Sequence, residues 1–312
     1  MLQHQYRAPW VNLFNQTIAN ELNPPNATPQ PFITCQLATV DSQGFPHVRT
    51  VVYRGFLFND KNNNILTLTT DKRMSKYEEL LHNDKFEIVF YFPISKKQYR
   101  FRGIARIIDN EYKPRVDLSS INPRTIIERE RSSSDSDSDF DSDQSADSDD
   151  DETVLEIPSG TSASSISSPP SACRPVSHSL LSPAVANSIQ QYKTANNLSY
   201  TNLHDLESVD LSPPSEREWN AEILRQWQGL SKKMRASFRK PAPKTKMDDE
   251  KQMKMDKIRR GVDGKKEDVG LENFALIALF TDYVDVYEME KDKRMIYEKD
   301  SYQMWKEDEV CP

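Results

Sequence analysis

The stretch "GFPHVRTVVYRGFLF", residues 44–58, has the pattern of a β-strand but carries two arginines among Val, Tyr and Phe. Successive side chains of a strand point to opposite faces, so Arg49 shares a face with Val51 and Tyr53, whereas Arg54 lies on the other face. A guanidinium on a half-buried strand needs either a partner or a route to water. The two arginines are therefore expected to lie in different surroundings.

Further apolar segments with a period of two lie on both sides of this stretch. Strands are expected at residues 31–40, 64–70, 85–93, 96–108, 274–290 and 294–300. Helical periodicity is found at 71–84, where Thr70 or Asp71 is placed to cap the helix, and at 217–238. Many strands, few helices and no β–α–β alternation indicate a mainly β (α+β) fold built on an antiparallel barrel. Only eight glycines and no GxGxxG or GxxxxGK[ST] motif exclude a dinucleotide-binding or P-loop fold.

Composition divides the chain into a first globular part, residues 1–117, an insertion at 118–215, and a second globular part at 216–312. The insertion is rich in Ser, Asp and Pro, so we expect it to be disordered. A charged loop is expected at about 244–270, inside the second globular part.

The segment 132–152 carries ten acidic and no basic residues, and without it the formal net charge changes from −7 to +3. Its Ser-Asp repeats are typical of acidophilic kinase sites, and phosphorylation would make it more anionic. Either a solvated spacer or a tail that binds basic partners fits this composition.

Several classes of protein are excluded by simple counts. No apolar run approaches the ~20 residues of a membrane helix, and the N-terminus lacks the apolar stretch of a secretory signal. The three cysteines are far apart and the five histidines are scattered, so we expect neither a disulfide framework nor a metal site. A soluble cytoplasmic protein is expected, with the nucleus as a further compartment.

The sequence "TTDKRMSK" gathers hydroxyl and basic groups where a strand gives way to a helix. Thr69, Thr70, Arg73, Ser75 and Lys76 surround the expected helix N-terminus, where backbone N–H groups and the helix dipole favour an anion. A phosphate suits this corner because several charge-assisted hydrogen bonds can hold a dianion. The alternative is that these basic side chains are solvated or paired.

A row of arginines follows on a later strand. Alternation places Arg100, Arg102 and Arg106 on one face of this strand, and Tyr99 and the other apolar residues on the opposite face. An exposed basic face explains the row, and nucleic-acid binding is the alternative. No RNP-like aromatic motif accompanies the row, which disfavours nucleic acid.

Taken together, these segments resemble the pyridoxamine 5'-phosphate oxidase-like family of FMN-binding split barrels. The resemblance is carried, in order, by G-x-P-x-x-R-T-V-V at 44–52, "TLTTDKRMSKYEEL" at 67–80, "QYRFRGIARI" at 98–107, Trp227 with R-x-x-F-x-x-P-x-P at 235–243, "RMIY" at 294–297, Trp305 and Pro312. It implies an antiparallel split β-barrel, FMN as cofactor, and a homodimer that shares the flavin site between subunits. The likeness is to the FMN-binding-domain branch rather than to authentic oxidases.

The resemblance also implies roles at the phosphate end of FMN. Arg49 takes the place of the family's strand arginine, Thr70 that of a hydroxyl, and Lys76 that of the phosphate-binding lysine. Ser75 stands where oxidases often have an arginine, so one positive charge is missing there. Arg73 is the candidate to replace it.

At the flavin ring, the resemblance assigns the backbone of Thr50, Val51 and Val52 to the ring edge. Gln98 matches a glutamine that approaches the flavin, and Arg294 matches a late arginine at its polar edge. Tyr287 falls near a tryptophan that covers the cofactor in oxidases.

The substrate end departs from the oxidase pattern. Glu290 and Asp292 stand where oxidases carry an arginine and a histidine, while Arg54 takes the place of a substrate-side lysine. Two carboxylates there would repel a phosphorylated substrate. We therefore expect an FMN-dependent oxidoreductase with an unidentified small-molecule substrate and unidentified catalytic residues. The alternatives are an authentic pyridoxamine 5'-phosphate oxidase and a non-catalytic flavin-binding or interaction module.

Overall fold

The structure is a computed structural model that describes residues 8–24, 28–29, 31–119, 174–188, 211–264, 267–300 and 304–312. The chain divides into one unit of residues 1–121 with 170–312 and a second unit of residues 122–169. The second unit, with the acidic segment 132–152, lies outside the described residues, so the account below concerns the first unit.

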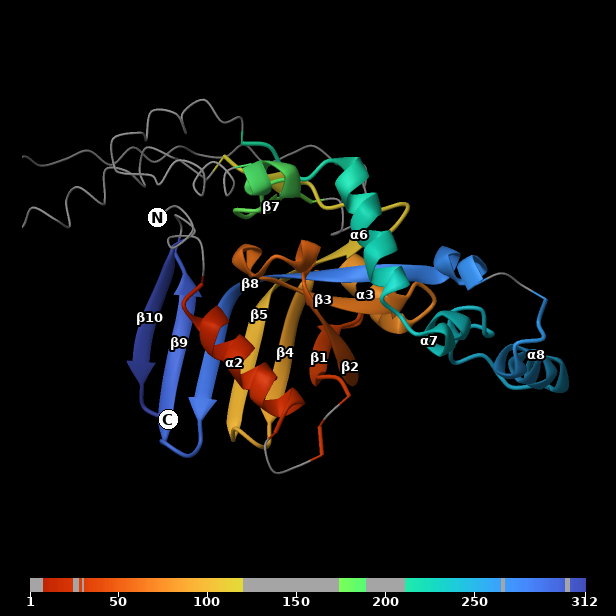
Figure 1. The fold of residues 1–312 in the computed structure, drawn as a ribbon, viewed down its shortest axis with the longest axis horizontal. Helices are drawn as coiled ribbons and strands as arrows, with labels where there is room; N and C mark the ends of the chain where they lie inside the picture. The colour runs from red at the N-terminus through yellow and green to blue at the C-terminus, as the bar shows by residue number, and fades with distance from the viewer. Residues whose placement is uncertain are drawn as a thin grey trace, which may run out of the picture. The chain divides into compact units, whose positions relative to one another are not determined.

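A closed antiparallel barrel organises the first unit (Figure 1). Its strands in the described residues are β1 (Thr34–Val40), β2 (Pro46–Phe56), β3 (Ile65–Asp71), β4 (Lys85–Phe92), β5 (Lys97–Ile108) and β8 (Phe274–Glu288). They follow the order β8-β3-β2-β1-β4-β5, and β5 pairs back with β8 to close the barrel. Beyond β8, the sheet continues into β9 (Lys293–Lys299) and β10 (Trp305–Val310). The predicted fold class is confirmed, and β10 is a strand that the sequence analysis did not predict.

Helix α2 (Trp10–Leu22), also not predicted, fills one side of the barrel core. Its buried positions recur on one helical face, which is the pattern of an amphipathic helix packing on a sheet. Trp10 and Phe14 are fully buried, and their rings contact Phe101 at centroid distances of 5.0 and 5.1 Å. In Figure 1, α2 lies across the strands of the barrel.

A second apolar layer lies on the outer faces of β3 and β8. Helix α6 (Glu216–Gln228) begins with a capping box between Ser215 and Glu218 and buries Trp219, Ile223 and Trp227 in this layer. The sequence predicted one helix at 217–238, but the chain turns at Gly229 and a short helix, α7 (Lys232–Ser237), follows.

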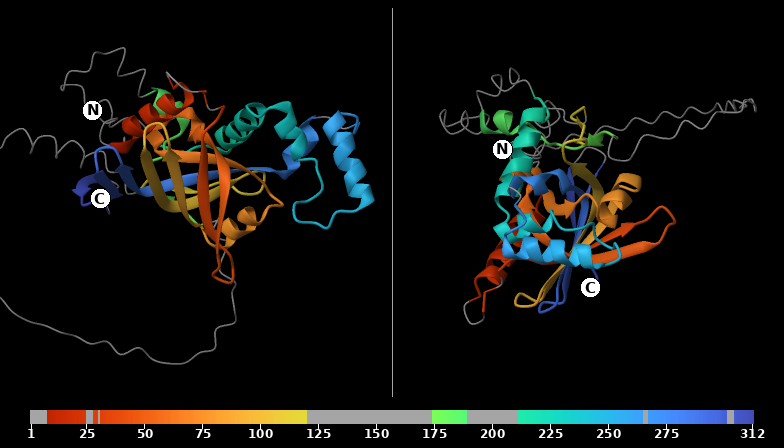
Figure 2. Two further views of the ribbon diagram at one scale, coloured as in Figure 1. Left: turned by 90° about the horizontal axis from the view of Figure 1, so that it is seen from below. Right: turned by 90° about the vertical axis from the view of Figure 1, so that its right-hand side faces the viewer.

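One segment of the second globular region differs from the prediction. The predicted charged loop at about 244–270 contains helix α8 (Asp249–Arg260), which is capped by Asp248 and ends at Gly261 in the left-handed conformation. Figure 2 shows α7 and α8 on the side of the molecule away from β9 and β10.

Residues 174–182 correct the prediction that the whole segment 118–215 is disordered. Strand β7 (Val176–Ser177) pairs in parallel with β6 (Val116–Asp117), and Val176 and Leu180 are buried in the outer apolar layer. His178 is also buried, with Nε2 3.1 Å from the Asn63 carbonyl oxygen and Nδ1 3.0 Å from Lys299 Nζ. These contacts fasten the end of the insertion to the barrel.

One glycine makes the closure of the barrel possible. The register of β5 against β8 shifts between Arg102 and Gly103, and a Cβ atom on Gly103 would lie 2.1 Å from the Phe280 carbonyl oxygen. Only a residue without a side chain allows the two backbones to approach so closely.

Among the helices of the described residues, none combines the length and the apolar character needed to cross a membrane.

Candidate functional site

The candidate site lies where the barrel sheet opens between β2 and β3. These strands pair only at Tyr53 with Leu68 and at Phe56 with Leu66. In the described residues, the part of β2 before Tyr53 pairs with β1 alone, and the end of β3 pairs with β8. The backbone of Thr50–Val52 therefore has one edge that no strand covers.

Helix α3 (Ser75–His82) packs next to this opening and is held by its buried residues Tyr77 and Leu80. Its N-cap residue is Met74, which makes no side-chain capping bond, so the prediction that Thr70 or Asp71 caps the helix is wrong. The first turn of α3 thus keeps N–H groups without a side-chain cap.

Arg49 points from β2 towards α3 and is not free. Its Nη2 donates to Glu79 Oε2 at 2.7 Å, and its Nη1 donates to the Thr39 hydroxyl and, at 3.4 Å, to the Leu37 carbonyl. The Glu79 side chain is 6% exposed, so this is a largely desolvated ion pair. The guanidinium is thereby fixed in orientation at the end of the barrel.

Lys76, from the first turn of α3, has a different environment. Its Nζ lies 3.3 Å from Thr70 Oγ1 and 2.8 Å from Met74 Sδ, and it makes no ion pair with a carboxylate in the part of the chain that the structure describes. Burial and the nearby charge of Arg49 lower the pKa of Lys76 to about 8. Arg49, Lys76 and the Thr70 hydroxyl thus lie close to one another at the opening, and with the Glu79 carboxylate counted against Arg49, the charge of Lys76 remains to attract an anion such as phosphate.

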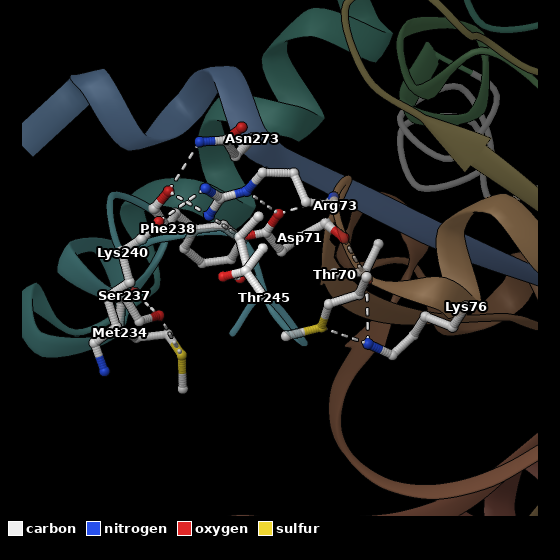
Figure 3. Close-up of polar contacts among 12 residues, drawn as sticks. Thr70, Asp71, Arg73, Lys76, Met234, Ser237, Phe238, Lys240, Thr245 and Asn273 are labelled. Carbon is white, nitrogen blue, oxygen red and sulfur yellow. Dashed lines mark hydrogen bonds and ion pairs between the residues drawn. The ribbon is translucent and has the colours of Figure 1, made fainter. Parts of the chain in front are cut away.

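Arg73 faces away from this cluster (Figure 3). Its guanidinium binds both carboxylate oxygens of Asp71, at 2.9 and 2.6 Å, and donates to the carbonyl oxygens of Lys240 at 2.8 Å and Phe238 at 3.0 Å. Asn273 donates to the same Phe238 carbonyl at 2.9 Å. In this structure Arg73 joins the β3–α3 turn to the segment after α7, and Thr70 and Lys76 lie on the other side of Asp71.

A second group of predicted residues forms a row across β5, β8 and β9. Gln98 pairs with Tyr287, which in turn pairs with Arg294. Arg294 is bound by both oxygens of the buried Asp285, at 3.0 and 2.7 Å, and Arg100 binds the same carboxylate. Burial raises the pKa of Asp285, but the hydrogen bonds and charges of the two arginines together lower it by more. The pKa therefore lies below its usual value.

The arginine row of β5 is paired rather than free. Arg100 binds Asp285, Arg102 lies 3.8 Å from the centre of the Tyr283 ring, and the buried Arg106 binds Asp84 at 2.6 Å. The expected exposed basic face is therefore only partly present, since Arg106 is 2% exposed.

At the end of the site where the resemblance predicts the substrate, the two acidic residues have partners. Glu290 lies 3.1 Å from Lys96 Nζ, and Asp292 accepts a hydrogen bond from the Tyr287 hydroxyl at 2.9 Å. Arg54 lies on the outer face of β2, where its Nε donates to Thr69 Oγ1 at 3.3 Å, and burial lowers its pKa. The predicted separation of Arg49 from Arg54 is confirmed.

Sequence reasoning missed Glu79, Thr39 and Asp285, the partners that hold the arginines. The spacing of Glu79 three residues after Lys76 places both on one side of a helix, which is a signal that was present in the sequence. The others depend on strand register, which the sequence does not specify.

Comparisons with known proteins identify sequences and a fold to which this chain is similar. Residues 7–109 match the family model for the pyridoxamine 5'-phosphate oxidase, FMN-binding domain. The chain is 33% identical to the uncharacterized protein YGR017W of Saccharomyces cerevisiae, over 100% of both chains. It is 40% identical to pyridoxine/pyridoxamine 5'-phosphate oxidase 2 of Arabidopsis thaliana over 74 residues, which are 24% of this chain and 36% of that protein.

A solved structure shares the fold. The pyridoxamine 5'-phosphate oxidase-related, FMN binding protein from Nostoc punctiforme superposes with a TM-score of 0.51 and 19% sequence identity, covering 98% of each chain.

Proposed function

Because the chain belongs to the pyridoxamine 5'-phosphate oxidase-like family of FMN-binding split barrels, whose cofactor is FMN, we propose that it is an FMN-dependent oxidoreductase. The observation that carries the proposal is the convergence of Arg49, Thr70 and Lys76 beside the uncovered edge of β2. A phosphorylated cofactor would neutralise the cations, and its ring would extend along the strand.

The chain's own groups have distinct tasks in this proposal. Glu79 and Thr39 hold the Arg49 guanidinium, which is thus oriented before the phosphate binds. Lys76 and Thr70 offer an ammonium and a hydroxyl to phosphate oxygens, and the backbone of Thr50–Val52 offers hydrogen-bonding groups to the ring edge. Bound FMN would supply the redox chemistry, which the protein positions and tunes.

We further propose that the protein is a homodimer. Gln98, Tyr287 and Arg294 pair with one another across β5, β8 and β9, near the turn that joins β8 to β9. That turn and α3 lie apart in Figure 1. A second copy of the chain would bring this row to the ring of a flavin held by Arg49 and Lys76. Size-exclusion chromatography with light scattering tests this, and a flavin-loaded monomer would contradict it.

An authentic pyridoxamine 5'-phosphate oxidase is the second candidate, favoured by the names of the partial relatives. The ion pair of Glu290 with Lys96 supports it too, since it reduces the repulsion that a phosphorylated substrate would meet. The acidic Asp292 favours a different substrate, because its carboxylate would repel a phosphorylated one. A non-catalytic flavin-binding module is the third reading.

The experiment is to purify the full chain, release the bound molecule by denaturation, and identify it by mass. The Arg49→Ala/Lys76→Ala double variant should lose FMN while keeping its circular dichroism spectrum, and full FMN retention would refute the site. Turnover of pyridoxamine 5'-phosphate with peroxide release would favour the authentic oxidase. A reducible flavin that no amine or reductant turns over would favour the non-catalytic module.

A further inference from the structure

A lysine from the second half of the chain reaches the candidate phosphate site. Lys244 Nζ donates to Ser75 Oγ at 2.6 Å, across 169 positions of sequence. Ser75 is the first residue of α3 and the neighbour of Lys76. Within the described ranges, Lys244 forms no ion pair with a carboxylate, although the chain around it is rich in charge.

Several contacts hold the segment that carries Lys244. Arg73 and Asn273 hold the carbonyl oxygens at the start of the segment 238–244, as Figure 3 shows for Phe238 and Lys240. Two prolines then stiffen the chain, and Thr245 closes a turn by donating from Oγ1 to the Ala242 carbonyl at 2.8 Å.

The backbone at Lys244 itself is unusual. Its φ of 65° lies in the left-handed region, which residues with a side chain rarely adopt. The residues on either side of Lys244 are held by the contacts above, and in this conformation its side chain meets Ser75.

We propose that Lys244 is a third cationic ligand of the FMN phosphate, supplying at Ser75 the positive charge that residue 75 itself lacks. This inference rests on the proposed function. Arg49 and Lys76 come from the first half of the chain and Lys244 from the second, so the phosphate would be held between the two halves. Three cations with the Thr70 and Ser75 hydroxyls match the several oxygens of a dianionic phosphate monoester.

The test compares FMN with riboflavin, which has the same ring but no phosphate. Apoprotein of the full chain is titrated into each flavin, and the dissociation constant is measured from flavin fluorescence. Lys244→Ala is expected to weaken FMN binding about tenfold, in the range of a lost charge-assisted hydrogen bond, and to leave riboflavin binding unchanged. Lys246→Ala, which removes an exposed charge two residues away, is the matched control and should change either constant less than about twofold.

A second variant separates charge from folding. In Lys244→Ala/Ser75→Arg, the cation returns on residue 75, and FMN affinity should recover to within about threefold of wild type. If Lys244→Ala and Lys246→Ala bind FMN equally well, or if Lys244→Ala weakens riboflavin binding as much as FMN binding, the inference about Lys244 is overturned while the proposed function stands. A wild-type chain that binds no FMN overturns both this inference and the proposed function.

Discussion

The proposed phosphate site predicts that FMN affinity falls as the pH rises from 7 to 9. The perturbed group is Lys76, whose pKa is about 8 because it is buried next to the positive charge of Arg49. In the apoprotein the ammonium is about nine-tenths charged at pH 7 and about one-tenth charged at pH 9. A bound phosphate raises this pKa, so binding at the higher pH must take up a proton.

The expected magnitude is an affinity loss of about tenfold between pH 7 and pH 9, provided that the pKa in the complex exceeds 9. The phosphate stays dianionic over this range because its second pKa is about 6. The assay is fluorescence titration of the full-length apoprotein with FMN at constant ionic strength, with riboflavin as the control for titration of the ring.

Lys76→Arg is the matched variant because a guanidinium stays charged over this whole range. Its FMN affinity should be flat from pH 7 to pH 9, and wild-type riboflavin binding should be flat too. A flat wild-type profile for FMN, or the same slope for riboflavin and FMN, would show that Lys76 does not contact the phosphate.

Three further outcomes are expected. Gly103→Ala should lower the free energy of unfolding by about 3 kcal/mol or more in urea denaturation, because its Cβ would meet the Phe280 carbonyl oxygen, whereas Gly229→Ala, with ordinary contact distances, should change it by less than about 1 kcal/mol. Asp285→Asn should lower the free energy of unfolding at pH 7 by about 1 kcal/mol, since two arginines lose their carboxylate partner but their side chains, 38% and 33% exposed, can be hydrated; unchanged denaturation midpoints would contradict this role. The wild-type Asp285 pKa is lowered in the fold, so its contribution is present at neutral pH and is lost as acid protonates it; the destabilisation caused by the variant should therefore shrink in acid. Deleting residues 132–152 should leave FMN content unchanged in the purified protein; loss of flavin would show that this acidic segment supports the site, and loss of solubility or folding would show that it is more than a spacer.

The sequence predicted the barrel because its strands alternate clearly. Period-two patterns identified every strand that closes the barrel, and the alternation of Arg49 with Arg54 is seen in the structure. Alternation states which face a residue takes but not which residue lies opposite. The pairing of Arg49 with Glu79 therefore could not be predicted, since its carboxylate comes from a helix 30 residues away.

Helix α2 and the segment 174–182 were missed for different reasons. Helix α2 has no side-chain N-cap, but Pro9 precedes it and Asn23 and Pro24 follow it, so boundary signals and apolar spacing were both present in the sequence and were overlooked. The segment 174–182 forms only two strand residues and buries few side chains, a signal too small to stand out within a Ser- and Pro-rich region.

Arg73 lies next to the candidate phosphate site, as the sequence motif indicated, but its contacts differ from those the resemblance implied. The resemblance suggested that its charge replaces the arginine missing at residue 75, but its guanidinium is paired with Asp71 and donates to two carbonyl oxygens. Those carbonyls belong to the segment that carries Lys244 to Ser75. Arg73 can thus affect a phosphate at α3 without touching it, by fixing the loop that provides the third charge.

Lys244 also affects how much FMN stabilises the folded protein. If Lys244 binds the phosphate together with Arg49 and Lys76, FMN adds one more contact between the two globular parts, which already meet where β8 pairs with β3 and β5. A ligand at 100 times its dissociation constant stabilises the protein that binds it by about 2.7 kcal/mol. Lys244→Ala would then lower the stabilisation that a fixed excess of FMN gives to the folded protein. The free energy of unfolding of the apoprotein should stay nearly unchanged, because Lys244 makes only an exposed hydrogen bond there.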